Sequence, residues 1–189
     1  FKVMQEFKCK NIVFSSSAAI YKANKKSLEE DSEIKPINPY GNTKSTIETI
    51  LKDIFNSDRS WRIVNLRYFN PIGAHPKGFL GEEPLEKPNN LFPYICGVAK
   101  GKYKLLEIFG NDWLTPDGTG VRDYIHVMDL AEAHNYALNF LLNNEPQIVS
   151  LNIGTGKGTS VLELVKLFEN VNKCKVPFAF AEKRKGDFP

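Results

Sequence analysis

The sequence predicts an α/β fold with a largely parallel sheet, and three features of the chain support this expectation. Strand-like and helix-like segments alternate along all 189 residues, which is the pattern of α/β proteins with parallel sheets. Residues 12–14 form a short, wholly apolar run, as expected for a strand that is buried on both faces. Small polar residues follow directly at 15–17, and open α/β sheets bind their ligands at such strand ends.

Several segments have the composition or the alternation of β-strands. The clearest is 62–70, where β-branched and aromatic residues alternate with polar ones before Pro71 and Gly73 end the run. The segment 124–127 is so short that it is either a strand or simply extended. In chain order the expected strands are 11–14, 62–70, 105–109, 124–127, 150–153 and 176–181.

Helices are expected between these strands, and their ends carry recognisable signals. Asp129 precedes one apolar periodic segment as a candidate N-cap, and Asn89 or Asn90 precedes another. The expected helices are 1–10 (the end of a longer helix), 40–56, 90–100, 130–142 and 160–172. The polar segment 22–38 and the Gly- and Pro-rich segment 75–89 are expected to be loops, the second long enough to be functional.

The helix predicted to begin after Asn38 places a tyrosine and a lysine near its start. Asn38 can cap the helix, and Pro39 suits its first position, where the missing N–H would be unbonded anyway. Tyr40 and Lys44 begin an apolar row, so we expect both to point inward. The row continues through Ile47, Leu51 and Ile54, with Ile50 and Phe55 beside it. A lysine on a buried face is costly unless its charge is used, which is a first indication of function.

Tyr40 and Lys44 lie one helical turn apart, which suits a role in proton transfer. Free tyrosine is a poor base at neutral pH, but an ammonium group within about 4–6 Å favours the phenolate. Ser17, at the end of the preceding strand, is placed to hydrogen-bond the same substrate hydroxyl. Together they suit an alcohol–ketone interconversion. Many helices contain this tyrosine–lysine spacing by chance, so the serines and the Asn38-Pro39 cap are needed to indicate function.

Composition and charge exclude several classes of function. The net charge of +3 is too small to indicate a nucleic-acid or membrane partner, and no apolar run approaches the roughly 20 residues that span a bilayer. Cys9, Cys96 and Cys174 are odd in number and far apart, which fits neither a disulfide framework nor a metal site. We therefore expect a reducing, cytoplasmic setting. Because Phe1 is not an initiator methionine and the chain stops abruptly, we expect a fragment.

Six sequence blocks resemble extended short-chain dehydrogenase/reductases, and the later blocks narrow the resemblance to the UDP-glucose 4-epimerases. The first blocks are 14–21 (FSSSAAIY), 38–44 (NPYGNTK) and 67–74 (RYFNPIGA). The narrower ones are 88–95 (PNNLFPYI), 108–112 (IFGND) and 117–127 (DGTGVRDYIHV). The resemblance extends from residue 11 to Asp187, and the last block is its most specific part.

The resemblance implies a fold and a reaction. Residues 1–70 would be the C-terminal half of a Rossmann-like NAD-binding domain. Residues 71–189 would be mainly a smaller α/β lobe that binds the UDP-sugar, with 105–127 and 128–155 crossing between the two. The implied reaction interconverts UDP-glucose and UDP-galactose: hydride moves from sugar C4 to NAD, and the 4-keto sugar takes it back on its other face.

The resemblance also assigns roles around the reacting carbon. Tyr40 would be the base and acid at the sugar 4-hydroxyl, and Ser17 would hold the 4-oxygen. Lys44 would bind the nicotinamide ribose and favour the tyrosine phenolate. The residues that would line the same pocket beside cofactor or sugar are Ser15, Ser16 and Tyr68.

A second set of residues is implied for the nucleotide diphosphate. Arg122 and Arg184 suit bidentate phosphate contacts. The alternatives are a salt bridge of Arg122 with Asp117 or Asp123, and a solvated Arg184. Asp187 matches the acidic ribose contact of the family. The other implied substrate contacts are Tyr68, Phe69, Asn70, Asn89, Asn90, Leu91, Glu107, Ile108 and Phe109, of which 107–109 would border the uracil.

The chain departs from the family pattern mainly by what it lacks. The strand and glycine-rich turn that bind the NAD pyrophosphate in the family do not precede Phe1, so this chain alone is expected to be inactive. An intact parent is expected to be a homodimer. Lys22 replaces a common glycine, and Asn42 and Thr43 replace a common Lys-Ser pair. Two alternatives stay open: another nucleotide-sugar enzyme, such as a dehydratase or decarboxylase, and a non-catalytic module that binds UDP-sugars.

Two further patterns are expected to be structural. Residues 154–160 follow a strand and open a helix, but Thr159 stands where a dinucleotide-binding loop has its third glycine, so we expect a tight turn. His75, His126 and His134 lack the spacing of metal ligands, and core or surface roles are expected for each.

Overall fold

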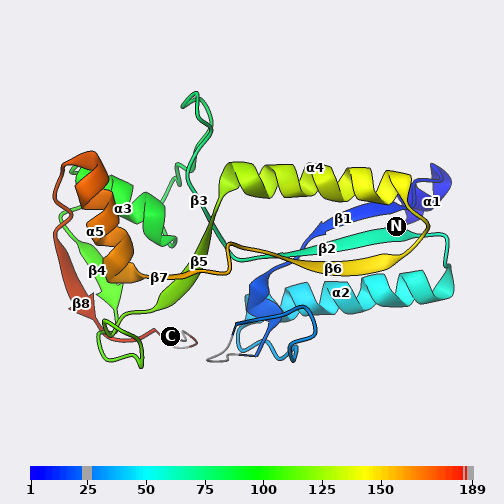
Figure 1. The fold of residues 1–189 in the computed structure, drawn as a ribbon, viewed down its shortest axis with the longest axis horizontal. Coiled ribbons are helices and arrows are strands. Elements are labelled where there is room, and N and C mark those ends of the chain that lie inside the picture. Colours follow the sequence, from blue (N-terminus) through cyan, green and yellow to red (C-terminus); the bar gives the residue numbers. More distant parts are fainter. Residues whose placement is uncertain (23–26, 185, 187–189) are drawn as a thin grey trace. The chain divides into compact units, whose positions relative to one another are not determined.

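The computed structural model describes residues 1–22, 27–184 and 186, and the chain divides into two compact units. Unit 1 comprises Phe1–Pro71 and Met128–Gly154, and unit 2 comprises Ile72–Val127 and Thr155–Pro189. Figure 1 shows the elements of each unit, coloured along the chain. Among the described residues, no helix combines the length and the apolar character that a membrane span requires.

Unit 1 is built on a parallel sheet with the strand order β1-β2-β6. The central strand β2 (Arg62–Tyr68) pairs with β1 (Asn11–Ser15) on one side and with β6 (Ile148–Ile153) on the other. Helix α2 (Pro39–Ser57) covers one face and helix α4 (Val127–Asn143) covers the other (Figure 1). The parallel strands and their covering helices confirm the predicted α/β fold.

The core of unit 1 lies in two layers, one on each side of β2. Successive side chains of a strand point to opposite faces, so neighbouring residues of β2 enter different layers. The layer toward α2 contains the buried residues Leu51, Phe55, Trp61 and Ile63. The layer toward α4 contains Val64, Leu66, Ala137 and Leu141. Asn65 and Arg67 of the same strand are buried as well, so each requires a polar partner.

The inward face of α2 differs from the predicted one. Tyr40 is 52% exposed, and Ile47 and Ile50 are also exposed, so the prediction that this row points inward is wrong for these residues. The buried residues of the helix are Gly41, Glu48, Leu51 and Phe55. The prediction failed because it located the buried face from apolar residues alone. Glu48 is charged, yet it lies on the buried face because its carboxylate is paired with buried Arg67.

The other elements of unit 1 lie close to their predicted positions and differ at their ends. Helix α1 (Lys2–Glu6) is shorter than predicted, and a single 3-10 turn, η1 (Ala18–Ile20), follows β1. Helix α4 begins at Val127, so Asp129 lies in its first turn and is not the N-cap. A carboxylate there still interacts favourably with the helix dipole. The predicted strand 62–70 is interrupted at Phe69 and resumes as β3 (Asn70–Ile72).

In unit 2, strand β4 (Leu106–Phe109) pairs in parallel with β8 (Phe178–Ala181). Strand β5 (Val121–His126) pairs antiparallel with β7 (Gly158–Ser160), a short strand that the sequence did not predict. Helices α3 (Leu91–Ala99) and α5 (Val161–Asn172) contribute apolar side chains to the core. Its buried residues are Tyr94, Ile95, Val98, Leu106, Ile108, Leu164, Val165 and Val176.

Asp117 and Ser160 join the 115–120 loop to the start of α5. The Ser160 hydroxyl accepts a hydrogen bond from the Glu163 amide (3.0 Å) and donates one to an Asp117 carboxylate oxygen. The other Asp117 oxygen accepts from the amide (3.0 Å) and the hydroxyl (2.7 Å) of Thr119. Burial by itself would raise the pKa of Asp117, but these hydrogen bonds hold its pKa below the ordinary value.

We predict that Gly41→Ala destabilises the protein even though alanine is the better helix former. A Cβ atom at position 41 would lie 2.3 Å from the backbone oxygen of Ala19, and no change of rotamer relieves that contact. Overpacking costs about 1–3 kcal/mol against about 1 kcal/mol of helix propensity, so a net loss of up to about 2 kcal/mol is expected. Urea denaturation measures it, with exposed Asn42→Ala as the control. Unchanged or higher stability would contradict the close approach.

Asp117→Asn is predicted to lower the free energy of unfolding by an amount that depends on pH. Because the folded-state pKa of Asp117 is depressed, its carboxylate stabilises the fold above the unfolded pKa of about 3.9. That contribution is lost as the pH falls through the folded value. The stability difference between wild type and variant should therefore be level from about pH 5 to 7 and shrink on acidification.

Urea unfolding at several pH values measures this difference. Asp53→Asn, which removes an exposed carboxylate from α2, controls for the general effect of losing one negative charge. A difference that does not change with pH would show that the hydrogen bonds of Ser160 and Thr119 do not favour the ionised form.

Candidate active site

The carboxyl ends of β1 and β2 bring several predicted site residues together in unit 1. Ser15 is the last residue of β1, and Tyr68 is the last residue of β2, its neighbour in the sheet. Ser17 caps η1, since its hydroxyl accepts a hydrogen bond from the Ala19 amide (3.2 Å). These side chains lie at the edge where open α/β sheets bind their ligands.

The first turns of α2 reach the same edge. Asn38 caps the helix by accepting a hydrogen bond from the Gly41 amide (2.8 Å), and Pro39 occupies the first position, as predicted. The Lys44 ammonium donates to the backbone oxygen of Ser15 (2.7 Å). It also lies 5.6 Å from the centre of the Tyr40 ring. Lys44 is thus fixed between the end of β1 and an exposed phenol.

His134 of α4 belongs to this cluster, which the sequence did not indicate. Its Nδ1 is 2.8 Å from the backbone oxygen of Leu130, and its Nε2 is 2.9 Å from the Ser15 hydroxyl. A carbonyl oxygen only accepts, so Nδ1 carries the hydrogen, and in the neutral ring Nε2 accepts from Ser15. Ser15 and His134 are separated by 119 residues, and no spacing rule connects positions so far apart.

Tyr68 lies within the same group of side chains. Burial raises the pKa of the Tyr68 phenol, the electrostatic effect of Tyr40 acts in the same direction, and a hydrogen bond with Ser15 opposes both. The Tyr68 and His134 rings are 6.3 Å apart between centres. The ends of β1 and β2 therefore bring Ser15, Tyr68 and His134 together.

Ser16 is placed differently from its two neighbours. Its side chain is fully buried, and its hydroxyl donates to the carboxylate of Glu48. Phe69 follows Tyr68, and its amide donates to the backbone oxygen of Ile153 (3.0 Å). Asn70 is exposed at the start of β3.

Unit 2 contains the predicted uracil contacts and the Asn89-Asn90 pair. Glu107 pairs with Lys87 (2.5 Å), and this hydrogen bond holds the pKa of Glu107 below its ordinary value. The side chain of Ile108 is buried in the core of the unit. Asn90 occupies the N-cap position of α3, but its side chain makes no capping bond and donates to Glu82 (2.7 Å). Leu91, the first residue of α3, packs against the core, and Asn89 is exposed beside the helix.

The two predicted phosphate ligands, Arg122 and Arg184, lie in or near the strands of unit 2. Arg122 belongs to β5, and its guanidinium donates to the backbone oxygen of Val121 (2.7 Å). The Arg184 guanidinium lies over the Phe109 ring, 4.6 Å from its centre. Asp187, the predicted ribose contact, lies outside the described residues.

Asp123 holds the conformation of the glycine-rich segment 154–160, which resembles a phosphate-binding loop. Its carboxylate accepts hydrogen bonds from the Thr155 amide (2.9 Å), the Thr155 hydroxyl (2.7 Å) and the Gly156 amide (2.8 Å). An acidic side chain therefore occupies the amides that a phosphate loop would offer to its ligand, in line with the predicted tight turn. Within residues 1–22, 27–184 and 186, no group of three or more His, Cys, Asp or Glu side chains is arranged to hold a metal ion.

Comparison with known proteins shows which enzymes are similar to this chain in sequence and fold. A rice (Oryza sativa subsp. japonica) UDP-glucose 4-epimerase 4 is 53% identical over 187 residues, which are 98% of this chain and 51% of that protein. UDP-glucose 4-epimerase of Bacillus subtilis (strain 168) is 51% identical, over 98% of this chain and 55% of that protein. The chain spans about half the length of the curated relatives it matches.

Solved structures of UDP-glucose 4-epimerases are also similar to this chain. UDP-glucose 4-epimerase from Bifidobacterium longum, in complex with NAD+ and UDP, superposes with a TM-score of 0.94 at 45% identity, over 99% of this chain and 56% of that one. Residues 1–154 match the sequence profile of a family that contains both epimerases and dehydratases. The chain therefore belongs to the NAD dependent epimerase/dehydratase family.

Proposed function

We propose that the protein carrying this chain interconverts UDP-glucose and UDP-galactose by 4-epimerisation through a 4-keto sugar. The observation that carries this proposal is the arrangement at the start of α2. The Tyr40 phenol is exposed there, beside a Lys44 ammonium anchored on the end of β1. Relatives with about 50% sequence identity are named for this reaction. The same side chains suit a substrate whose reacting group is a sugar hydroxyl.

Tyr40 is the proposed acid and base of the reaction. Its oxygen takes the proton of the sugar 4-hydroxyl as the C4–H bond breaks, and the same phenol returns a proton to the 4-oxygen when the hydride comes back. No net oxidation results, because the hydride that leaves C4 returns to C4. Lys44, close to the ring, stabilises the phenolate, and the Ser17 hydroxyl hydrogen-bonds the 4-oxygen.

The residues at the strand ends fit a nicotinamide nucleotide. Ammonium and hydroxyl side chains can hydrogen-bond the hydroxyls of a ribose. The Lys44 ammonium donates one N–H to the backbone oxygen of Ser15, and its other N–H groups can donate to a ligand. Lys44 and Tyr40 are the proposed ribose contacts, with Ser15 and Tyr68 beside the nicotinamide. When bound, NAD would supply the hydride acceptor and donor. The B. longum relative was solved in complex with NAD+.

Unit 2 residues are the proposed contacts of the UDP group. Arg122 and Arg184 would bind the diphosphate, since guanidinium groups pair with phosphates through two parallel hydrogen bonds. The remaining proposed contacts of the UDP-sugar are Phe69 and Asn70 of unit 1, together with Asn89, Asn90, Leu91, Glu107, Ile108, Phe109 and Asp187. Ser16, which was expected to line the sugar pocket, is not among them, because it is fully buried. For Ile108, whose side chain is buried, only backbone groups remain for this contact. We also propose that 1–70 belong to the cofactor domain and 71–189 mainly to the substrate lobe, with 105–127 and 128–155 crossing between them.

Location and assembly complete the proposal. Cys9, Cys96 and Cys174 are all free thiols, which favours a reducing cytoplasmic compartment. Apolar side chains exposed along α4 favour a homodimer formed through this helix. They are Tyr136, Leu138, Phe140 and Leu142.

Tyr40→Phe is predicted to lower kcat by at least about 100-fold, because general acid–base groups contribute about 10²–10⁴-fold. The dissociation constant of UDP, measured by calorimetry, should stay within about 3-fold of the wild-type value, because the phenol oxygen acts on the sugar and not on the UDP group. The assay uses the whole protein with NAD bound and measures UDP-galactose formed from UDP-glucose. Tyr136→Phe, at an exposed tyrosine of α4, is the matched control.

Product analysis separates the alternatives. Near-normal turnover of Tyr40→Phe contradicts the assigned chemistry, whereas wild-type protein that binds UDP-sugar without turnover indicates a binding module. A nucleotide sugar that has lost water or carbon dioxide, identified by NMR, indicates a dehydratase or a decarboxylase.

A further inference from the structure

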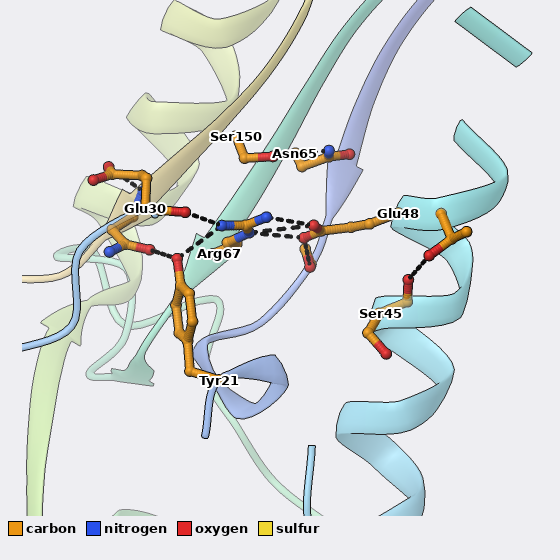
Figure 2. Close-up of polar contacts among 10 residues, drawn as sticks. Tyr21, Glu30, Ser45, Glu48, Asn65, Arg67 and Ser150 are labelled. Atoms are coloured by element: carbon orange, nitrogen blue, oxygen red, sulfur yellow. Dashed lines mark hydrogen bonds and ion pairs between the residues drawn. The ribbon is translucent and has the colours of Figure 1, made fainter. Parts of the chain in front are cut away.

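A buried polar network joins α2 to β2 in unit 1 (Figure 2). At its centre Arg67 of β2 pairs with Glu48 of α2, with Nη2 2.7 Å from Oε2 and Nε 3.1 Å from Oε1. Ser16, after the end of β1, donates its hydroxyl to the same carboxylate. All three residues are at most 7% exposed, so the pair is shielded from solvent.

The opposite side of the Arg67 guanidinium continues the network. Its Nη1 donates to the Tyr21 hydroxyl (2.9 Å) and to the backbone oxygen of Glu30 (2.8 Å). The Tyr21 hydroxyl in turn donates to the side-chain oxygen of Asn152 at the end of β6 (2.7 Å). Figure 2 shows Arg67 lying between Tyr21 and Glu48. Arg67 therefore connects α2 with the segment that follows η1 and, through Tyr21, with β6.

Stability alone gives a weak reason for such a pair. Taking two charges out of water is costly, and replacing a buried ion pair with apolar residues of similar volume is often neutral or stabilising. Leu51, one turn after Glu48 on the same helix, is apolar and almost fully buried, so this side of α2 also accommodates apolar residues. An ion pair here needs an explanation other than the strength of the fold.

The sequence positions of its members supply that explanation. Ser16 lies between Ser15 and Ser17, and Arg67 immediately precedes Tyr68. Glu48 lies one turn beyond Lys44 and two turns beyond Tyr40, on the same side of α2. Ser16, Glu48 and Arg67 are thus each a sequence neighbour of a candidate active-site residue, or lie one helical turn from one.

We propose that Glu48 and Arg67 are positioning residues, which fix the rotation of α2 about its axis and thereby place Tyr40 and Lys44 against the strand ends. The proposal rests on the function proposed above and adds residues that do not touch the substrate. A guanidinium bound to a carboxylate through parallel hydrogen bonds has a fixed relative orientation. Its other N–H groups bind Tyr21 and Glu30, so the carboxylate is held in one place, which restricts rotation of the helix that carries it.

Other contacts between the same elements restrict this rotation less. The Lys44 ammonium reaches the Ser15 carbonyl at the end of a flexible chain, so it tolerates a turned helix. The approach of Gly41 to Ala19 sets how closely α2 can come to η1. Neither contact specifies the angle at which the Tyr40 phenol faces the end of β1.

The double variant Glu48→Leu with Arg67→Met tests the proposal, because it removes both charges and keeps an apolar volume. In the whole protein with NAD bound, we expect an unfolding temperature within a few degrees of wild type, kcat lowered about 10- to 100-fold and KM within about 3-fold. The control replaces the part-exposed pair of Lys10 and Asp58 at the far end of α2 by Lys10→Met with Asp58→Asn. It should leave kcat unchanged.

A crystal structure of the double variant separates this inference from the proposed function. Displaced Tyr40 and Lys44 side chains support positioning whatever reaction the wild type catalyses, and an unmoved α2 overturns it. A folded double variant with wild-type kcat also overturns it. If wild type itself fails to interconvert the two sugars, only the proposed function is contradicted.

Arg67→Lys covers the case in which the double variant does not fold. Lysine keeps the buried charge beside Glu48 but cannot also bind Tyr21 and Glu30 through one planar group. We expect a folded protein whose kcat falls several-fold and whose KM is unchanged. Wild-type kcat in this variant, with an undisplaced Tyr40, would mean that charge compensation and not orientation is the role of Arg67.

Discussion

The close contact between α2 and the carboxyl ends of β1 and β2 is the constraint on which the candidate active site depends. Three interactions maintain it at successive turns of the helix. Gly41 allows the backbone of η1 to approach, the Lys44 ammonium binds the last carbonyl of β1, and Glu48 is bound by Arg67 and Ser16. A helix held at three levels keeps its first turn in place even though that turn is exposed. This is the preorganisation that the proposed proton transfer requires.

Burial changes along one side of the same helix in a way that matches the chemistry. Tyr40 is exposed and can meet a substrate, Lys44 is half-buried with its charge directed to a carbonyl, and Glu48 is shielded from solvent. In the proposed mechanism the acid and base Tyr40, the ammonium beside it and the carboxylate that anchors the helix thus follow one another at intervals of one turn. A phenol and an ammonium at the surface remain able to bind hydroxyl groups, whereas a buried carboxylate needs the full set of partners that Arg67 and Ser16 provide.

Sequence reasoning found the elements of the fold and the Tyr40–Lys44 pair, because cap signals, spacing and alternation are local. It failed where distant segments meet. The α2 face was misplaced because Glu48 finds its partner in β2, and no pattern in the sequence indicated that His134 binds Ser15. Strand β7 has too few residues to show a period. The turn at 154–158 was predicted, but its partner Asp123, on another strand, was not. Each miss involves a polar contact between residues far apart in the chain, which a pattern of apolar residues cannot contain.

In the proposed mechanism, hydride leaves C4 and returns to the same carbon while the Tyr40 phenol holds the proton. This is measured by placing deuterium at C4 of UDP-galactose and letting the whole protein bring the reaction to equilibrium in ordinary water. The UDP-glucose formed should retain the deuterium at C4, because a transferred hydride does not exchange with solvent. Loss of deuterium to water would mean that C4 gives up a proton, and it would contradict the mechanism assigned to Tyr40 and Lys44.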